Sequence, residues 1–277
     1  MPKVTIGMPL YNGAHLLREG LESLARQTYD DFEVLICENG STDDSRAIAE
    51  EFVARDRRFR MAALDETISA WDNFARCLTL SQSPYFAWRA YDDYAADNFI
   101  EALARGLDAH PQAQLAACEA RTLNVSSGRE RRFPTPALAA DPARARRQLL
   151  AGVRAQWFYG LYRREAVMPV FRQCQIAYPH EWAGDHLMLY PFLIKPCVFL
   201  TNETWFMQRT GFARGRTPAA PAVERAIFRD YVRFCARRVD EAALPAREHL
   251  YLKARLSLDA HRHTFRMTRL LRRAIIG

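Results

Sequence analysis

Two adjacent carboxylates, Asp92 and Asp93, follow the short apolar run Tyr85–Ala90. A hard divalent cation such as Mg²⁺ or Mn²⁺ takes oxygen ligands, and one or two carboxylates suffice when a diphosphate and water complete its shell. Because successive strand residues point to opposite sides, we expect only one of the pair to reach a metal directly. The pair therefore predicts a metal-assisted diphosphate site, and a solvated loop is the alternative.

Two further polar segments each follow an apolar run, Pro9–Gly13 near the N-terminus and Glu38–Asp44 about thirty residues later. The ring of Tyr11 can flank a flat base. The carboxylate of Glu38 accepts hydrogen bonds from a base or ribose, and the amide of Asn39 both donates and accepts. The alternative is purely structural, a strand-to-helix turn in the first segment and a helix cap at Thr42–Asp44 in the second.

The pattern of the first hundred residues alternates between strand and helix. Strands are expected at 3–8, 32–37, 59–64 and 85–90, and helices at 14–27, 41–55, 70–80 and 98–109. Such alternation predicts an α/β fold, a doubly wound and mostly parallel sheet with helices on both faces. Ligands of these sheets bind beyond the carboxyl ends of the strands, where all three polar segments fall.

The remainder of the chain is less regular. We expect a hairpin of 114–125 with 130–133, a strand at 157–162, helices at 143–150, 164–173 and 185–194, strand pieces at 197–207, and helices from 222 to the end. These elements predict a main domain of residues 1–210 and a C-terminal helical extension of residues 211–277.

The composition limits the class of protein. The chain has 277 residues and a formal net charge of +7, and no segment approaches the roughly 20 uncharged apolar residues of a membrane span. The N-terminus runs straight into the first strand without a signal-peptide pattern, which predicts a cytoplasmic protein. Six scattered cysteines without a C-x-x-C pair indicate reduced thiols and no zinc site.

The basic charge is concentrated at the C-terminus. Arg262, Arg266, Arg269 and Arg273 follow one another at helical spacing and fall on one face of the expected helix. A basic amphipathic helix of this kind can lie on an anionic membrane, which makes residues 261–277 a candidate for peripheral contact with the inner face of the cytoplasmic membrane. The alternative is a packed helix with a solvated basic face.

Together, the three polar segments resemble those of glycosyltransferase family 2, whose catalytic domain has the GT-A fold. That family shows P-x-Y-N after the first strand, a D-D-G-S-T-D-like stretch after the second, and a D-x-D-like stretch after the fourth. Here these stand as Pro9–Asn12, Glu38–Asp43 and Ala90–Asp93. The resemblance continues through Asn73–Arg76, Tyr159–Arg163 and Gly184–Leu187 and covers roughly residues 3–210.

The resemblance implies an inverting transferase that moves a sugar from a nucleotide-diphosphate donor to a hydroxyl of a glycan or lipid-linked acceptor, in cell-surface polysaccharide synthesis. Asp185 is the implied base for the acceptor hydroxyl, and Asp92 with Asp93 the implied ligands of Mn²⁺ or Mg²⁺. The implied nucleotide-binding residues are Pro9, Tyr11, Asn12, Glu38, Asn39, Asn73 and Asp92.

Two departures from the family pattern bear on these roles. Asn39 stands where a second acid is usual, and Ala90 stands where the first acid of D-x-D is usual. Asp185 also has a structural alternative as the cap of the following helix, and His186 and Glu181 are the fallback bases.

Three other functions remain open. A non-catalytic nucleotide- or glycan-binding module of the same fold is compatible with Ala90 and Asn39. A nucleotidyltransferase is disfavoured because residues 10–15 contain one Gly and no Lys to hold phosphates. Nucleic-acid binding is disfavoured because no aromatic-basic recognition module accompanies the arginine-rich tail.

Overall fold

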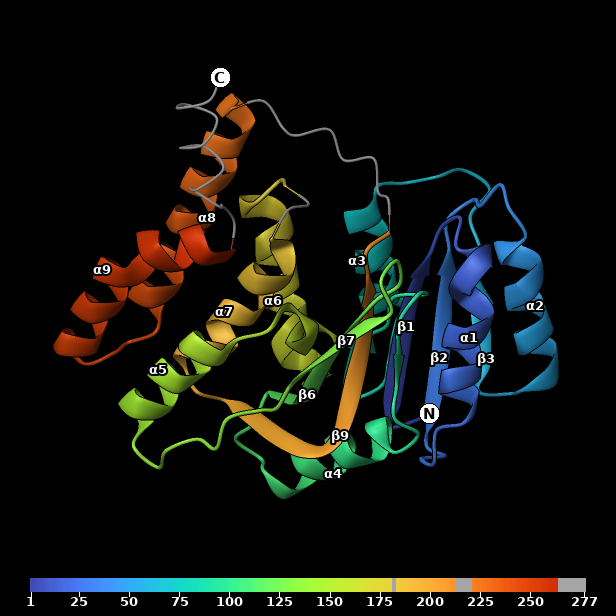
Figure 1. Ribbon diagram of the computed structural model, residues 1–277, viewed down its shortest axis with the longest axis horizontal. Coiled ribbons are helices and arrows are strands. Elements are labelled where there is room, and N and C mark those ends of the chain that lie inside the picture. Colours follow the sequence, from blue (N-terminus) through green and yellow to red (C-terminus); the bar gives the residue numbers. More distant parts are fainter. Residues whose placement is uncertain (181–182, 213–220, 264–277) are drawn as a thin grey trace. The chain divides into compact units, whose positions relative to one another are not determined.

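The computed structural model describes residues 1–180, 183–212 and 221–263 (Figure 1). The described chain divides into two compact units. The first contains the whole sheet and its flanking helices, and the second consists of helices alone. None of the described helices combines the length and the apolar character needed to cross a bilayer.

The first unit is built on one sheet. Its strands are β1 (Val4–Leu10), β2 (Phe32–Glu38), β3 (Phe59–Ala62), β4 (Tyr85–Trp88), β5 (Tyr94–Ala95), β6 (Leu115–Asn124), β7 (Arg129–Phe133), β8 (Leu161–Arg163) and β9 (Val198–Thr210). Their order is β3-β2-β1-β4-β8-β6-β9-β5, with β7 paired to β6. The run β3-β2-β1-β4 is parallel, as is β6 with β9, whereas β8, β5 and β7 pair antiparallel. The carboxyl ends of β1, β2 and β4 therefore meet at one edge.

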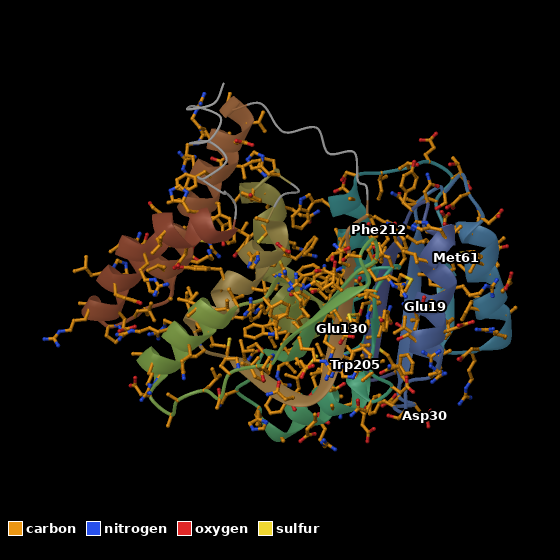
Figure 2. The ribbon with its side chains drawn as sticks, viewed as in Figure 1. Glu19, Asp30, Met61, Glu130, Trp205 and Phe212 are labelled. Carbon is orange, nitrogen blue, oxygen red and sulfur yellow. The ribbon has the colours of Figure 1, made fainter. Side chains whose placement is uncertain are left out.

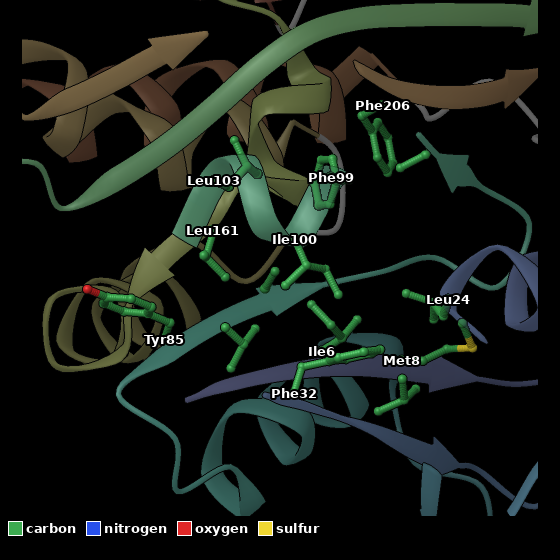
Figure 3. Close-up of a cluster of buried hydrophobic side chains, with 14 of the residues drawn as sticks. Ile6, Met8, Leu24, Phe32, Tyr85, Phe99, Ile100, Leu103, Leu161 and Phe206 are labelled. Atoms are coloured by element: carbon green, nitrogen blue, oxygen red, sulfur yellow. The ribbon is translucent and has the colours of Figure 1, made fainter. Parts of the chain in front are cut away.

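Helices cover both faces of this sheet. They are α1 (Ala14–Ala25), α2 (Ser45–Arg55), α3 (Ala70–Leu80) and α4 (Phe99–Ala109), and a short 3₁₀ helix, η1 (Ala155–Tyr159), precedes β8. On one face, Ile6 and Met8 of β1 are buried with Leu24 of α1 and other apolar side chains of α1, α2 and α4 (Figure 3). On the other face, a Cβ atom built on Gly7 would lie 2.6 Å from Cβ of Cys77 in α3. Glycine at position 7 therefore lets α3 pack directly on β1.

The second unit contains α5 (Pro142–Gly152), most of α6 (Arg164–Ala177), α7 (Gly184–Ile194), α8 (Pro221–Glu241) and α9 (Ala246–His263). Its hydrophobic centre is α7, in which nearly every residue from Leu187 to Ile194 is buried. A buried arginine links three of the helices. Arg146 of α5 donates from Nε to the carbonyl oxygen of Ile194, at 2.6 Å, and from Nη1 to Oε2 of Glu248 on α9, at 3.0 Å.

The α/β class, the doubly wound sheet and the C-terminal helices expected from the sequence are confirmed. The predicted helix at 70–80 is α3 with the same bounds, and the predicted hairpin is β6 with β7. The strand predicted at 157–162 is wrong in its first part, because residues 155–159 form η1 and β8 begins at Leu161. A Cβ atom built on Gly160 would lie 2.4 Å from the carbonyl oxygen of Ala116 on β6. The backbone at Gly160 therefore passes so close to β6 that a residue with a side chain would not fit at this position.

The predicted domain boundary at residue 210 coincides with the end of β9, the last strand of the first unit. Helices α5 and α7, expected within the main domain, cluster with α8 and α9. The assignment of residues 1–210 to one main domain stays a prediction. The predicted basic face at Arg266, Arg269 and Arg273 lies outside the described residues.

The substitution Glu248→Ala tests the buried ion pair of the second unit. It leaves the guanidinium of Arg146 buried without its carboxylate, so we expect the free energy of unfolding to fall by about 3 kcal/mol in urea denaturation. The matched control is Glu203→Ala, which breaks an exposed ion pair with Arg105 and should change it by less than about 1 kcal/mol. Replacing Arg146 and Glu248 together by Met should restore most of the loss. Equal effects of the two single substitutions would contradict a structural role for the buried pair.

Candidate functional site

Hydrogen bonds between side chains and backbone N–H groups join the loop after β1 to the loop after β2. Asn12, whose φ of 48° is left-handed, accepts at Oδ1 from the backbone N–H of Thr42, at 2.8 Å. Its own N–H donates to Oγ of Ser41, at 3.1 Å, and the N–H of Gly13 donates to Oγ of Ser45, at 2.8 Å. Asn12 thus fixes the two loops against each other, and its contact with a nucleotide stays a prediction.

The carboxylate of Asp43 holds the first residues of two helices. Its Oδ2 accepts from the N–H of Ala14, which begins α1, and its Oδ1 accepts from the N–H of Ser45, which begins α2, both at 3.0 Å. Burial opposes ionisation, but hydrogen bonds from Ser45 and Ala14 outweigh it and lower the pKa of Asp43. The negative charge also complements the positive ends of both helix dipoles. The helix-capping function expected for this segment is therefore provided by Asp43.

Glu38, the last residue of β2, has a fully buried side chain. Its Oε1 accepts from the N–H of Ser41, at 2.6 Å, whereas its Oε2 has no hydrogen-bond partner among the described residues. A buried carboxylate oxygen without a donor is unfavourable by about 1–3 kcal/mol or more, and nearly all such atoms in native proteins have a partner. The position therefore suits a ligand that brings an N–H or O–H group to Oε2.

The two predicted amides at this edge, Asn39 and Asn73, are engaged with the backbone. Asn39 donates to the carbonyl oxygen of Ile68 and accepts from its N–H, both at 3.0 Å. Asn73 donates to the carbonyl oxygen of Cys37, at 2.9 Å, and accepts from Nη1 of Arg76, at 3.2 Å. These bonds fix the orientation of both amides, and direct contact of either amide with a nucleotide stays a prediction. The pairing with Ile68 explains why an amide stands at position 39 where the family usually has an acid, because an ionised carboxylate could not donate to that carbonyl group.

The acidic turn after β4 lies close to the start of α1. A Cβ atom built on Gly13 would lie 2.5 Å from the ring of Tyr91, and one built on Gly20 would lie 2.4 Å from the carbonyl oxygen of Tyr91. Both glycines are thus required for the approach of the turn. The structure therefore brings the three polar segments together at one edge of the sheet, as their positions after β1, β2 and β4 predict.

Arg209, on β9, holds this turn in place. Its Nη1 donates to the carbonyl oxygen of Asp92, at 2.9 Å, and its N–H donates to Oδ1 of Asp93, at 2.8 Å. The same guanidinium lies 4.7 Å from the ring centre of Tyr94 and forms an ion pair with Glu19, which projects from α1 (Figure 2). Because these bonds fix both acidic residues at once, Arg209 positions the turn.

Asp92 and Asp93 differ as candidate metal ligands. Burial, with the neighbouring charge of Asp92, raises the pKa of Asp93 to about 8, although the N–H of Arg209 and the charge of Arg89 oppose the shift. The Oδ1 of Asp93 accepts from the N–H of Arg209, and the role of Asp93 as a metal ligand stays a prediction. One carboxylate is enough for Mg²⁺ or Mn²⁺ on a diphosphate, and Asp92 fits that requirement. The described residues contain no group of three or more His, Cys, Asp or Glu side chains that would form a larger site.

A buried cation lies behind the acidic turn. Arg89 is almost completely buried, and its guanidinium lies 4.8 Å from the ring centre of Phe99 and 5.0 Å from that of Phe206. Burial lowers its pKa to about 10, which leaves it charged at neutral pH. None of its guanidinium nitrogens has a hydrogen-bond partner among the described residues. Its positive charge acts on Asp93 through the low-polarity interior.

The predicted base, Asp185, lies in the second unit, in the first turn of α7. Its Oδ1 accepts from the N–H of His186, at 2.7 Å. The cap residue of α7 is Ala183, with a left-handed φ of 61°, so the alternative role of Asp185 as the helix cap is not fulfilled. Burial lowers the pKa of the fallback base His186 to about 4, which makes it a weak base at neutral pH. Glu181 lies outside the described residues. The catalytic role of Asp185 stays a prediction.

The substitution Arg209→Gln tests how the acidic turn is held. It removes the ion pair with Glu19 and the contact with Tyr94, so we expect amide hydrogen exchange of residues 91–95 to rise at least tenfold. The matched control is Arg121→Gln, on the neighbouring strand, where the guanidinium stacks on Trp205 at 4.5 Å. Exchange of residues 91–95 should not change in that control. Unchanged exchange in Arg209→Gln would show that the turn is held by other contacts.

Curated proteins similar to this chain are named as glycosyltransferases. GlyG of Streptococcus pneumoniae serotype 4 is 28% identical over 100 residues, which are 36% of this chain and 33% of GlyG. GlyA of the same organism is 30% identical over 127 residues, 46% of this chain and 18% of GlyA. The chain thus spans a third or less of the length of these two relatives.

Two solved structures share the fold. S. aureus TarS in complex with UDP-GlcNAc has a TM-score of 0.70 at 17% identity, over 96% of this chain and 74% of the TarS chain. A mannosyltransferase from Pyrobaculum calidifontis, in complex with GDP-Man and Mn²⁺, has a TM-score of 0.54 at 15% identity, over 93% of this chain and 81% of that chain.

The family model described as Glycosyl transferase family 2 matches residues 5–171, which include β1 to β4, all three polar segments and β8. The match covers more than half of the 277 residues. The geometry of the edge and the match of the sequence lead to the same conclusion: this chain belongs to glycosyl transferase family 2.

Proposed function

We propose that this chain is an inverting glycosyltransferase that moves a sugar from a nucleoside-diphosphate donor to a hydroxyl group of a glycan or lipid-linked acceptor, in the assembly of a cell-surface polysaccharide. Membership of the family and the similarity to proteins named as glycosyltransferases support the reaction class. The single observation that carries the proposal is the buried, unpartnered Oε2 of Glu38 at the end of β2.

The carboxylate of Glu38 is suited to a nucleotide base. Its Oε2 would accept from a ring N–H, which uracil, thymine and guanine carry and which adenine and cytosine lack. The ring of Tyr11, exposed at the end of β1, is available to flank the base. Solved structures of the same fold contain UDP-GlcNAc and GDP-Man, so uridine and guanosine donors are the first candidates.

The donor's diphosphate would be bound next to the acidic turn. A divalent cation, Mn²⁺ or Mg²⁺, held by Asp92 would neutralise the charge that develops on the departing nucleoside diphosphate. Asp93 would support the turn through its bond to the N–H of Arg209. The solved mannosyltransferase of this fold contains Mn²⁺, which supports a metal here.

Asp185 would act as the base that takes the proton of the acceptor hydroxyl. A neutral hydroxyl is a poor nucleophile, and a carboxylate that takes its proton typically contributes about 10²–10⁴ in rate. As the acceptor oxygen bonds to the anomeric carbon, the bond from that carbon to the diphosphate oxygen breaks, and the hydroxyl proton passes to Asp185. One direct displacement of this kind inverts the anomeric centre. Membrane contact through residues 261–277 and a cytoplasmic location stay predictions.

A thermal-shift and turnover experiment tests the proposal. UDP, GDP, dTDP and their sugar conjugates are titrated with and without Mn²⁺. We expect one nucleotide class to raise the melting temperature, because a ligand at 100 times its Kd stabilises the folded state by about 2.7 kcal/mol. Asp92→Asn should abolish the metal-dependent part of the shift. Asp44→Asn is the matched control, because Asp44 makes no side-chain cap bond at the start of α2.

Turnover separates an enzyme from a binding module. With the donor so identified, we expect the wild-type chain to release the nucleoside diphosphate from the sugar conjugate. Asp185→Asn should keep the thermal shift and lose about 10²–10⁴ in rate. A wild-type chain that binds a donor without ever cleaving it would instead establish the non-catalytic module. No shift with any nucleotide would contradict the donor site itself.

A further inference from the structure

The exposed face of α8 carries a single kind of side chain over most of its length. Between residues 225 and 237, every exposed residue of this helix is an arginine: Arg225, Arg229, Arg233 and Arg237. The side chains of the last three are 62%, 74% and 73% exposed. A solvent-facing helix normally mixes acids and bases, so a row of one sign is unusual.

The spacing makes these arginines a continuous row, here called the arginine row. With a rise of 1.5 Å per residue, guanidinium groups four residues apart follow one another at about 6 Å, over roughly 18 Å in all. Residues at i and i+4 are neighbours on a helix surface. The row therefore presents an extended strip of positive charge along α8.

The carboxylates beside the row do not cancel its charge. Asp230, only 15% exposed, contacts Arg229 at 3.0 Å and Arg233 at 3.8 Å, but its Oδ2 also binds Nε2 of His180. Glu241 contacts Arg237 at 3.1 Å and is shared with the buried Arg238. The row therefore keeps a net positive charge, and its exposed guanidinium groups retain N–H donors for an external anion.

The same unit also exposes large aliphatic side chains. Ile176 on α6 is 85% exposed, Leu250 and Leu258 on α9 are 71% and 51% exposed, and Val223 on α8 is 46% exposed. Leu250 and Leu258 are two turns apart and lie on one side of α9 with the exposed Ala254 between them. Exposed basic and aliphatic side chains together are typical of surfaces that lie in the headgroup region of a bilayer.

We propose that the arginine row of α8 is a docking surface for the anionic headgroups of a lipid bilayer. The exposed aliphatic residues of the same unit favour a bilayer over a single-stranded polynucleotide, whose bases would stack on exposed aromatic rings. The aromatic side chains of α8 do not serve that purpose: Tyr231 and Phe234 are buried, and Phe228 stacks on His261. The proposal does not rest on the transferase reaction, and it concerns arginines other than those of residues 261–277.

Vesicle sedimentation with the full-length chain tests the docking surface. Vesicles of phosphatidylcholine alone are compared with vesicles containing 30% phosphatidylglycerol, at about 0.1 M salt. We expect binding only to the anionic vesicles and a decline as salt is raised. In the variant R225Q/R233Q/R237Q, which keeps the Arg229–Asp230 pair, the partition coefficient should fall about 100-fold, since each basic residue near the surface contributes about fivefold.

The control variant is R129Q/R131Q/R132Q on β7. This variant removes an equal number of positive charges, three, from exposed positions of the first unit. Its partition coefficient should therefore stay within about threefold of the wild-type value. A second variant of the tail, R266Q/R269Q/R273Q, is measured alongside. Melting temperatures of all three variants establish that they fold. If the triple variant of the row does not fold, each single substitution should still lower the partition coefficient about fivefold.

The remaining outcomes overturn the proposal. These are no binding of the wild-type chain to anionic vesicles, equal losses in the row and β7 variants, or a loss confined to the tail variant. Row-dependent binding of an RNA or of an anionic glycan without binding to vesicles would assign the row to another polyanion. Cleavage of the donor is measured separately without vesicles, so failure of docking and failure of the transferase reaction are distinguishable.

Discussion

The carboxylate of Asp43 is the contact on which the edge of the sheet after β1 and β2 depends. It accepts the first N–H groups of α1 and α2 together, and so fixes the loop after β1 against the loop after β2. The anion and the two positive helix ends stabilise each other, and hydrogen bonds of Asn12 and Ser45 reinforce the same junction. Because both loops are fixed in this way, Glu38 can be held buried with one oxygen bonded to the chain and the other without a partner. The position of Glu38 therefore depends on the junction between these two loops.

Helices and strands could be predicted where their caps and the spacing of their apolar residues lie within the element itself. The helix at 70–80 has the expected bounds because Ser69 caps it and apolar residues recur at helical spacing. The 3₁₀ helix of residues 155–159 was missed because its aromatic run is also typical of a strand, and the close contact of Gly160 with β6 that limits the strand comes from distant sequence. The antiparallel pairing of β8 and β5 likewise depends on contacts that no local pattern encodes.

In the candidate site, too, some features follow from the local sequence and others depend on residues far away in the chain. Loops after parallel strands meet at one edge, so the position of Glu38 and of the acidic turn could be predicted. The bonds of Asn39 to Ile68 and of Asn73 to Cys37 could not, because each joins segments about thirty residues apart. Arg209 is more than a hundred residues from the turn it holds, and nothing near it in the sequence indicates that partner. Arg89 did leave a signal, a charged residue directly after the apolar strand β4, but its meaning depends on its contacts with the rings of Phe99 and Phe206.

The most direct test of the donor site is calorimetric titration of the Glu38→Gln variant with the nucleoside diphosphate that binds the wild-type chain. The amide keeps the size and burial of the side chain but can present an N–H donor in place of the unpartnered oxygen. We expect at least tenfold weaker binding of the nucleotide, about 1.4 kcal/mol, with an unchanged affinity for pyrophosphate, which has no base. Equal nucleotide affinity of the variant and the wild-type chain would contradict recognition of the base by Glu38.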